Sequence, residues 1–216
     1  LDTMRVLAAN DPHNAERIFP YIGGEEVNTS PTHAHHRYVI DFADFPLRRD
    51  STLGSWFLDE GTDACDERRQ EWLRNGIVPN DYPDEVAGDW PDLLEIVDRR
   101  IKPQRIKLPP SNAWNKSVAK YWWRWGAYRK ELNRALVGLR RYMFVPNLSP
   151  HLLVTFINAG VVTGAPHNVV AFPNLAPFSA IQSRPHEVWA RFFSSSMKDD
   201  LRYAPSDCFE TFPFPE

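Results

Sequence analysis

Apolar residues recur every three or four positions along residues 91–101, which is the spacing of one face of an α-helix. Four side chains make up this face: Leu93, Leu94, Val97 and Ile101. Pro91 suits the first turn of a helix, and Pro103 follows the last apolar position. The acids at the start and the arginines at the end both suit the helix dipole. The pattern therefore predicts an amphipathic helix here.

Shorter patterns predict further elements on either side of this helix. A helix is expected over residues 63–74 with Gly76 just beyond its end, and another near residues 128–138. Runs of β-branched and aromatic residues predict strands at 37–42, 142–145, 151–158 and 168–172. Residues 175–195 should be helical with an interruption at Pro185. Residues 1–20 should be a tail or linker, and 199–216 should pack as an extended tail. Together these elements predict an α+β fold, with a small mixed or antiparallel sheet flanked by helices.

The composition is that of a globular protein. The chain has 216 residues, of which 43% are hydrophobic and 25% charged, enough for one large domain or two small ones. No apolar run approaches the roughly 20 residues of a membrane span, and we expect no membrane partner. Cys65 and Cys208 are far apart in sequence, which favours reduced thiols in a cytoplasm. Because residue 1 is leucine, we expect the chain to be a piece of a longer protein.

Charge is strongly divided along the chain. Residues 41–98 hold sixteen acids and five arginines, whereas residues 99–141 hold thirteen Lys and Arg against Glu131 alone, a local charge of +12. Trp, Tyr and Asn residues lie among these cations. Cations for phosphates, aromatic faces for bases and amides for base edges are typical of a nucleic-acid surface. The alternative is a pair of helices with solvated cations on one side and Trp in the core.

The sequence contains no recognisable catalytic centre. There is no Gly-x-Ser-x-Gly motif, no glycine-rich phosphate loop, and no spacing of acids typical of a metal site. Gly23-Gly24 predicts a turn or a close backbone approach. His33, His35 and His36 are too closely spaced for a zinc site and are expected in a solvated loop. We therefore expect no catalytic residue, no metal and no cofactor in this chain.

Several longer stretches resemble a known family. They are FPYIGGEEVN (19–28), RYVIDF (37–42), residues 93–103 followed by YWW (121–123), QSRPHEVWARFF (182–193) and DLRYAPSDCFETFPFP (200–215). Together they resemble the C-terminal part of MmeI-like DNA methyltransferases, the type IIL restriction–modification proteins and their relatives in phage defence.

The resemblance implies a domain organisation. Residues 1–172 would be a DNA target-recognition domain, with an acidic insert at 45–88 that has no counterpart in the family, and residues 173–216 a helical C-terminal piece packed on it. In the family these parts follow an adenine-N6 methyltransferase domain that binds S-adenosylmethionine. The parent protein would then be a site-specific, adenine-specific DNA methyltransferase, with or without endonuclease activity.

The resemblance also indicates candidate site residues. Residues 145–155 correspond to the region where base-reading side chains vary with specificity, so the base-reading candidates are Asn147, Ser149, His151 and Thr155. Each could equally be an ordinary turn or strand-edge residue. The candidates for contacts with the DNA backbone are Lys116, Lys120, Arg124, Arg129, Arg134, Arg140 and Arg141. His186, Glu187 and Arg191 are expected to form an ion-paired helix face with a structural role.

These observations predict a sequence-specific double-stranded DNA recognition domain that works with its parent's methyltransferase domain in cis. Two other classes remain open. The basic surface could dock an acidic protein partner, or the Trp cluster could be a stacking platform for RNA or single strands.

Overall fold

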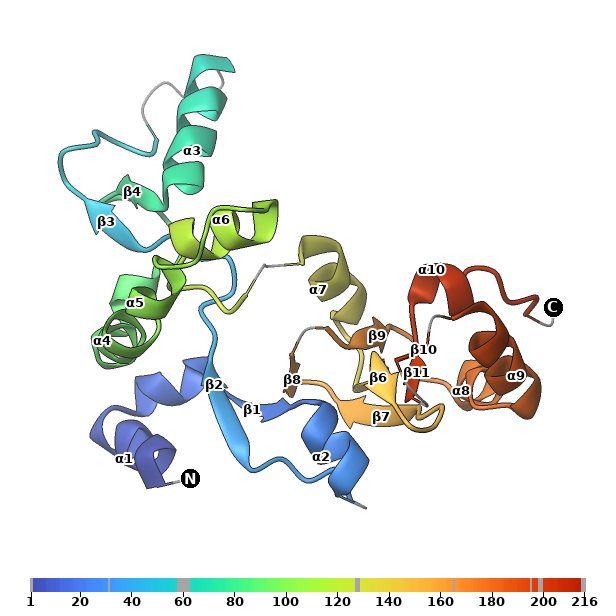
Figure 1. Ribbon diagram of the computed structural model, residues 1–216. Coiled ribbons are helices and arrows are strands. Elements are labelled where there is room, and N and C mark those ends of the chain that lie inside the picture. Colours follow the sequence, from blue (N-terminus) through green and yellow to red (C-terminus); the bar gives the residue numbers. More distant parts are fainter. Residues whose placement is uncertain are drawn as a thin grey trace. The chain divides into compact units, whose positions relative to one another are not determined.

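The computed structural model describes residues 2–30, 32–57, 63–126, 129–164, 166–194, 196–197 and 200–214. It is an α+β protein, as predicted, with helices around several small sheets (Figure 1). The chain forms two compact units. We call residues 19–39 with 129–216 the C-terminal unit, and residues 2–18 with 40–128 the N-terminal unit. The predicted boundary between residues 172 and 173 does not separate these units, and stays a prediction about the family's domains.

A three-stranded antiparallel sheet lies at the centre of the C-terminal unit. Its middle strand β5 (Arg141–Val145) pairs with β7 (Thr155–Asn158) and β9 (Asn168–Val170). In the register of these strands Phe144 lies opposite Thr155, and Val145 lies opposite Asn168. Residues 142–145 are all buried, because β5 has a strand on each side and packs on both faces.

Two smaller sheets accompany the central one. β6 (Leu148–Ser149) pairs antiparallel with β11 (Asp200–Arg202), which pairs in turn with β10 (Ser196–Met197). β1 (Ile18–Ile22) lies between β2 (Arg37–Ile40) and β8 (Val162–Thr163), and runs parallel to β8. The helices are α2 (Gly24–Thr29), α7 (Lys130–Leu136), α8 (Leu175–Ile181), α9 (Arg184–Phe193) and α10 (Pro205–Cys208).

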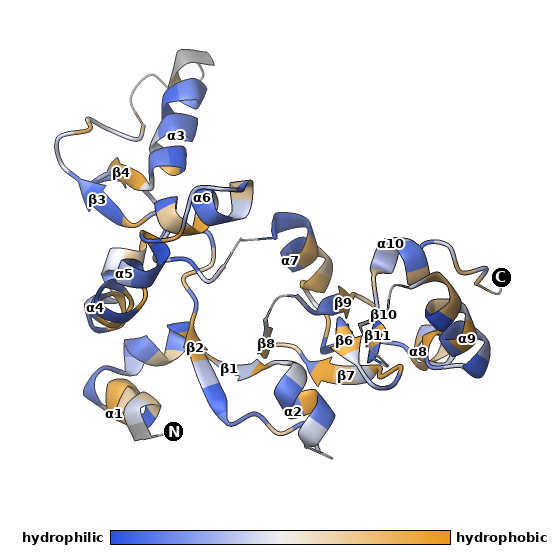
Figure 2. Cartoon of the chain, in the orientation of Figure 1, coloured by the Kyte–Doolittle hydropathy of each residue, from blue (hydrophilic) through white to orange (hydrophobic). Residues whose placement is uncertain are grey.

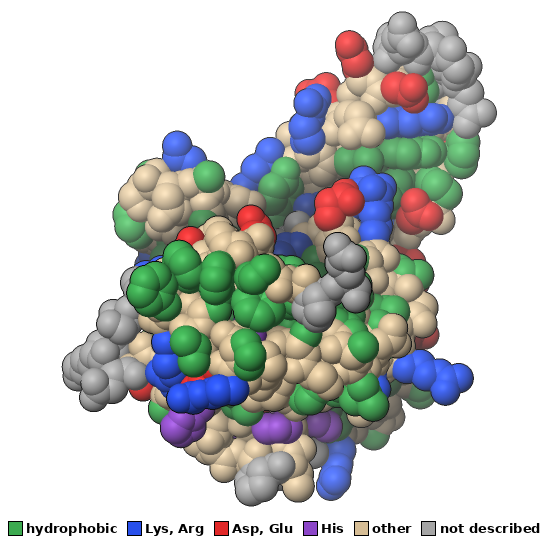
Figure 3. Space-filling view, turned by 90° about the vertical axis from the view of Figure 1, so that its right-hand side faces the viewer, with side chains coloured by type: hydrophobic (Ala, Val, Ile, Leu, Met, Phe, Trp, Pro, Cys, Tyr) green, Lys and Arg blue, Asp and Glu red, His purple; other side chains and the backbone are tan. Residues whose placement is uncertain are grey.

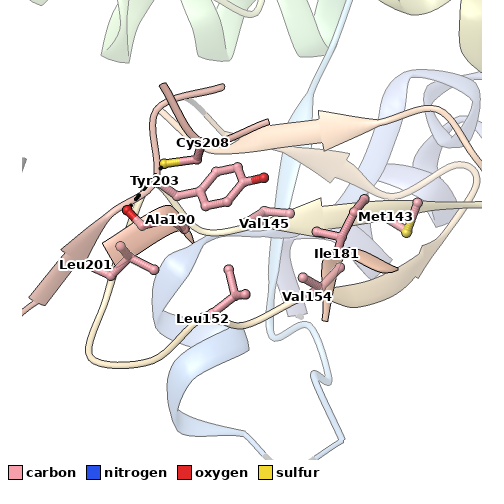
Figure 4. Packing of buried hydrophobic residues seen from close by; sticks show 9 residues of the cluster. All are labelled: Met143, Val145, Leu152, Val154, Ile181, Ala190, Leu201, Tyr203 and Cys208. Atoms are coloured by element: carbon pink, nitrogen blue, oxygen red, sulfur yellow. Dashed lines mark hydrogen bonds between the residues drawn. The ribbon is translucent and has the colours of Figure 1, made fainter. Parts of the chain in front are cut away.

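Two hydrophobic clusters hold this unit together, one on each side of β5. The first joins β5 to the C-terminal helices, and Figure 4 shows its buried members: Met143, Val145, Leu152, Val154, Ile181, Ala190, Leu201, Tyr203 and Cys208. The second joins the alternate residues of β5 to β1 and α2, through Tyr142, Phe144, Ile22, Val27 and Ile157. Because successive side chains of β5 point to opposite faces of the sheet, this one strand contributes to both clusters.

The N-terminal unit is mostly helical. It contains α1 (Asp2–Asn10), the 3-10 helix η1 (Pro12–Arg17), α3 (Asp63–Asn75), η2 (Ala87–Asp89), α4 (Pro91–Arg100), α5 (Lys102–Arg105) and α6 (Ala113–Lys120). Strands β3 (Arg48–Asp50) and β4 (Ile77–Pro79) form a parallel pair. Its main core gathers around Trp90 and Leu93, both fully buried. In Figure 2 most of α3 is hydrophilic, which agrees with its many charged residues.

Several predicted elements are confirmed and others are wrong. The helices at 63–75 and 91–100 are present, and Gly76, with φ +71°, ends the former in a conformation that suits glycine. The prediction of a tail or linker over residues 1–20 is wrong, because residues 2–22 form α1, η1 and β1. The described residues of the 45–88 segment contain β3, α3 and β4. Of the predicted strand 151–158, only residues 155–158 form a strand, β7. The predicted helix 175–195 is interrupted at residues 182–183, so that Pro185 lies in the first turn of α9. Tyr128 and Asp199, which begin two predicted segments, lie outside the described residues.

Candidate nucleic-acid interface

Two arginines of the basic stretch are built into the N-terminal unit. The Arg105 guanidinium donates to the carbonyl oxygens of Trp122, at 2.9 Å, and Arg124. Arg124 donates to the Phe45 carbonyl oxygen at 3.3 Å and lies over the Tyr121 ring. Burial lowers the pKa of both arginines from the usual value. Arg124, a predicted phosphate contact, therefore has protein partners in this structure.

Ion pairs also neutralise some of the cations. Arg99 pairs with Glu95, and Lys102 lies 2.5 Å from Asp98, each one helical turn away. In contrast, four exposed cations of residues 99–126 form no ion pair within the described part of the chain: Arg100, Lys107, Lys116 and Lys120. Lys116 and Lys120 are four residues apart on α6, so they lie on the same face of that helix. This face can bind two neighbouring phosphates.

Helix α6 is positioned by its own cap. The side chain of Asn112 accepts a hydrogen bond from the Asn115 amide at 2.8 Å, which satisfies one of the free donors of the first turn. Val118 is the buried anchor of the helix, whereas Trp114 on the same helix is 46% exposed. The helix thus presents an aromatic side chain and two lysines outside the core.

The tryptophans of the stretch divide into core and surface residues. Trp123 is 3% exposed and donates from Nε1 to the Phe45 carbonyl oxygen at 2.9 Å. Trp122 packs against the same core, and Lys102 lies over its ring. The alternative of Trp in the core is therefore right for these two residues. Trp114 and Trp125 remain exposed, at 46% and 36%.

In the C-terminal unit the predicted phosphate contacts have different surroundings. Arg129 and Arg140 are exposed and form no ion pair among the described residues, and the same is true of Lys130, which was not a predicted contact. Arg134 is exposed and lies 3.2 Å from Glu131. Arg141 donates from Nε to the Pro173 carbonyl oxygen at 2.9 Å and lies over the Phe156 ring, so it holds its own strand in place.

The four predicted base-reading residues lie between β5 and β7. Ser149 is 5% exposed, and its hydroxyl donates to Oδ1 of Asn28 on α2 at 3.0 Å, so this side chain is held inside the unit. His151 is exposed. Thr155 is half-buried at the start of β7.

Asn147 is held by its backbone. Its carbonyl oxygen accepts from the Tyr203 amide at 2.8 Å, and its amide lies 3.4 Å from Nδ1 of His167. Within the described residues its carboxamide has no hydrogen-bond partner. An amide side chain on a fixed backbone can donate to and accept from the same base edge.

Residues from three distant parts of the chain hold this segment, and the sequence did not indicate them. Asn28 and Tyr203 hydrogen-bond to the segment, and the His167 ring faces the Asn147 amide. The only signal was the glycine pair: a Cβ atom at Gly24 would lie 2.9 Å from Cε1 of His167. The predicted close backbone approach is therefore confirmed, and it accommodates this histidine.

Helix α9 carries the expected ion pairs. Glu187 accepts from Arg184 at 2.8 Å and Arg191 at 3.0 Å, and these bonds lower the pKa of Glu187 from its usual value. His186 does not belong to this face. It is fully buried, and its Nε2 lies 2.9 Å from the Tyr203 hydroxyl. Figure 3 looks onto the side where α9 lies; hydrophobic side chains gather there, and Val188, Phe192 and Phe193 of α9 are exposed.

The described residues contain no group of three or more His, Cys, Asp and Glu that could hold a metal ion. None of the described helices has the length and apolar character needed to cross a membrane. His33, His35 and His36 lie in the loop before β2, as predicted; His35 and His36 are exposed, whereas His33 is half-buried. Cys65 and Cys208 are both buried, one in each unit, and form no disulfide.

Comparison with known proteins identifies the second half of the chain. Residues 111–216 match the family model described as "MmeI, target recognition domain". The match supports an MmeI-like target recognition domain in this part of the chain. The match begins just before α6, contains the segment between β5 and β7, and continues through α9 and α10.

A solved structure of the type IIL restriction–modification enzyme MmeI in complex with DNA shares the fold of the whole chain. The TM-score is 0.60 with 14% sequence identity, over 100% of this chain and 22% of the MmeI chain. The chain therefore spans about a fifth of the length of that enzyme. A search of curated proteins gives no match.

Proposed function

We propose that this chain recognises a specific double-stranded DNA sequence on behalf of an S-adenosylmethionine-dependent adenine-N6 DNA methyltransferase. The parent would belong to a restriction–modification or phage-defence system of the bacterial cytoplasm. The observation that carries the proposal is the match of residues 111–216 to the MmeI target recognition domain. The likeness of the whole fold to MmeI, whose structure was solved with DNA, supports it.

The distribution of charge supports a polyanionic partner. Seven exposed cations between residues 99 and 141 form no ion pair among the described residues: Arg100, Lys107, Lys116, Lys120, Arg129, Lys130 and Arg140. When such unpaired cations bind phosphates, counterions condensed on the DNA are released. This release gives affinity that does not depend on the DNA sequence. Lys116 and Lys120 on α6, and Arg129 and Arg140 in the C-terminal unit, are the predicted contacts that best fit this role.

Sequence would be read by the segment between β5 and β7. Asn147, His151 and Thr155 are at least partly exposed there, and each good pair of contacts with a base edge contributes about 1–3 kcal/mol of discrimination. Ser149 would support the segment through Asn28 rather than touch a base. The target adenine would be flipped into the methyltransferase domain, since stacking hides its amino group in the duplex. That domain would hold S-adenosylmethionine, and this chain alone would not methylate.

The test is a titration of the purified chain against a random-sequence duplex library at about 50 and about 200 mM salt. We expect affinity to fall steeply with salt and a short asymmetric motif to be enriched at the higher concentration. Equal binding of all duplexes would contradict sequence recognition. If the chain binds no duplex at either salt concentration, the parent protein goes through the same selection. Failure of the parent to select a motif would overturn the proposal.

A second candidate function rests on Trp114 and Trp125. Their exposed rings lie among cations, an arrangement that also suits stacking of unpaired bases. A preference for single strands over duplexes in the same titration would favour this function.

A further inference from the structure

His167 contacts two segments that are distant in sequence. It lies directly before β9, where Asn168 pairs with Val145, and its ring packs on Phe144 with centroids 5.0 Å apart. The Gly24 amide donates to Nε2 at 2.9 Å, and the Asn147 amide faces Nδ1 at 3.4 Å. One half-buried side chain therefore links the start of α2 to the turn between β5 and β6.

The two amide contacts compete for one acceptor. A neutral imidazole has a single bare nitrogen, so it accepts from either Gly24 or Asn147, but not from both at once. The shorter contact makes Nε2 the acceptor, which leaves the Nδ1 hydrogen facing the Asn147 amide. The ring thus limits how closely Asn147 can approach, and its position sets the position of the turn.

Other bonds close the set of contacts around Asn147. The Tyr203 amide donates to the Asn147 carbonyl oxygen at 2.8 Å, and the Tyr203 carbonyl oxygen accepts from the Asn168 side chain at 3.0 Å. Asn168 follows His167 directly in the chain. The backbone of Asn147 is therefore held between β9, the residue after β11 and His167, while its carboxamide has no bond to a described residue.

Gly24 gives a way to move the ring without changing His167 or Asn147. A Cβ atom at this position would lie 2.9 Å from Cε1 of His167, so the imidazole must shift. Gly24 is at the first position of α2 and does not have a positive φ, so alanine fits its backbone. Gly24→Ala should therefore displace His167 and leave α2 intact.

We propose that His167 is a specificity-determining positioning residue: it fixes the turn that carries Asn147, and so sets how strictly Asn147 discriminates one base pair of the DNA site. The proposal rests on the proposed function and adds to it a residue that does not itself contact a base. His167 acts through Asn147, so loss of its imidazole should affect the same base pair that Asn147 reads.

The experiment measures binding of the full chain to its selected duplex and to the single-base-pair variants of that duplex. Asn147→Ala first identifies the base pair at which discrimination falls, by roughly tenfold for a good contact. His167→Ala and Gly24→Ala should each lower discrimination several-fold at this base pair only. The double variant Asn147→Ala/His167→Ala should discriminate no worse than Asn147→Ala, because the two residues act in series. His35→Ala removes an imidazole from an exposed loop of the same unit. It should change neither the affinity for the selected duplex nor the discrimination at this base pair.

Four results would count against the inference. Discrimination that is unchanged in His167→Ala, or lost equally at all base pairs, overturns the positioning role while the proposed function stands. Additive effects of the two substitutions show that His167 acts independently of Asn147, which also overturns it. A wild-type chain without sequence preference overturns the proposed function and this inference together. Thermal unfolding of each variant verifies that the compared proteins are folded.

Discussion

Arg37 donates from Nε and Nη2 to the two carboxylate oxygens of Glu26, at 2.6 and 2.7 Å. The Glu26 side chain is fully buried and also accepts from the Gly23 amide at 2.9 Å, whereas Arg37 is 44% exposed and lies over the Tyr21 ring. This ion pair joins β2 to α2. Because Asn28 of α2 holds Ser149, the pair also supports the segment proposed to read bases.

Replacing Glu26 by Gln should destabilise the C-terminal unit. The amide keeps the shape of the carboxylate but loses its charge, and its NH₂ group faces donors. We expect a loss of about 2 kcal/mol in the free energy of unfolding, the range of hydrogen bonds to charged groups. Urea unfolding at pH 7 measures it. Glu25→Gln is the matched control: this neighbour is 67% exposed and 3.8 Å from Arg37, so its effect should be small. Equal losses of unfolding free energy in the two variants would show that the buried Glu26–Arg37 pair contributes no more than the exposed Glu25.

The same pair predicts a dependence of stability on pH. The hydrogen bond from Arg37 lowers the pKa of Glu26 from 4.5 to about 2. A carboxyl group with a lower pKa in the folded state stabilises the protein fully above its unfolded pKa, and this contribution is lost as the pH falls through the folded value. The difference in unfolding free energy between wild type and Glu26→Gln should therefore shrink as the pH falls from 4.5 towards 2. A difference that stays constant over this range would contradict the assignment to Glu26.

The sequence predicted the elements whose signals are local. The helix at 91–100 follows from its own apolar spacing, and the end of α3 follows from Gly76. It did not predict α1 or β1. In the case of β1 the reason is that this strand pairs with β8, which is far along the chain and too short to recognise. Propensity carries no information about such partners.

The candidate site shows the same division. A run of cations is visible in sequence, but whether Arg124 faces solvent depends on the Phe45 carbonyl, 79 residues away. Ser149 has the chemistry of a base-reading residue, yet Asn28, 121 residues away, holds its hydroxyl. Which polar groups have a partner is a property of the tertiary structure.

Removing the two lysines of α6 should weaken DNA binding without changing its specificity. In Lys116→Gln/Lys120→Gln two phosphate contacts are lost, so the slope of log affinity against log salt should become shallower by about 1.8. All duplexes should be affected alike, because phosphate contacts carry no sequence information. Titrations at several salt concentrations measure the slope.

The control for this pair is Arg99→Gln. Arg99 is exposed, but it already forms an ion pair with Glu95 on the same helix. Its removal should leave the salt slope nearly unchanged. A change in slope as large as that of the α6 variant would show that overall charge, rather than the α6 face, determines binding.

The single-strand alternative is best tested at Trp114, since the structure excludes Trp123 as a probe. Trp123→Ala removes a core side chain that is 3% exposed, and should cost about 3–5 kcal/mol of stability. Any loss of binding in that variant would reflect unfolding of the N-terminal unit.

Trp114→Ala removes a ring that is 46% exposed, so thermal unfolding should change little. If Trp114 stacks on unpaired bases, its replacement should weaken single-strand binding by roughly tenfold and leave duplex binding unchanged. If the duplex is the partner, the wild type should bind single strands weakly. Trp114→Ala should then leave the affinities for single strands and for duplex both unchanged.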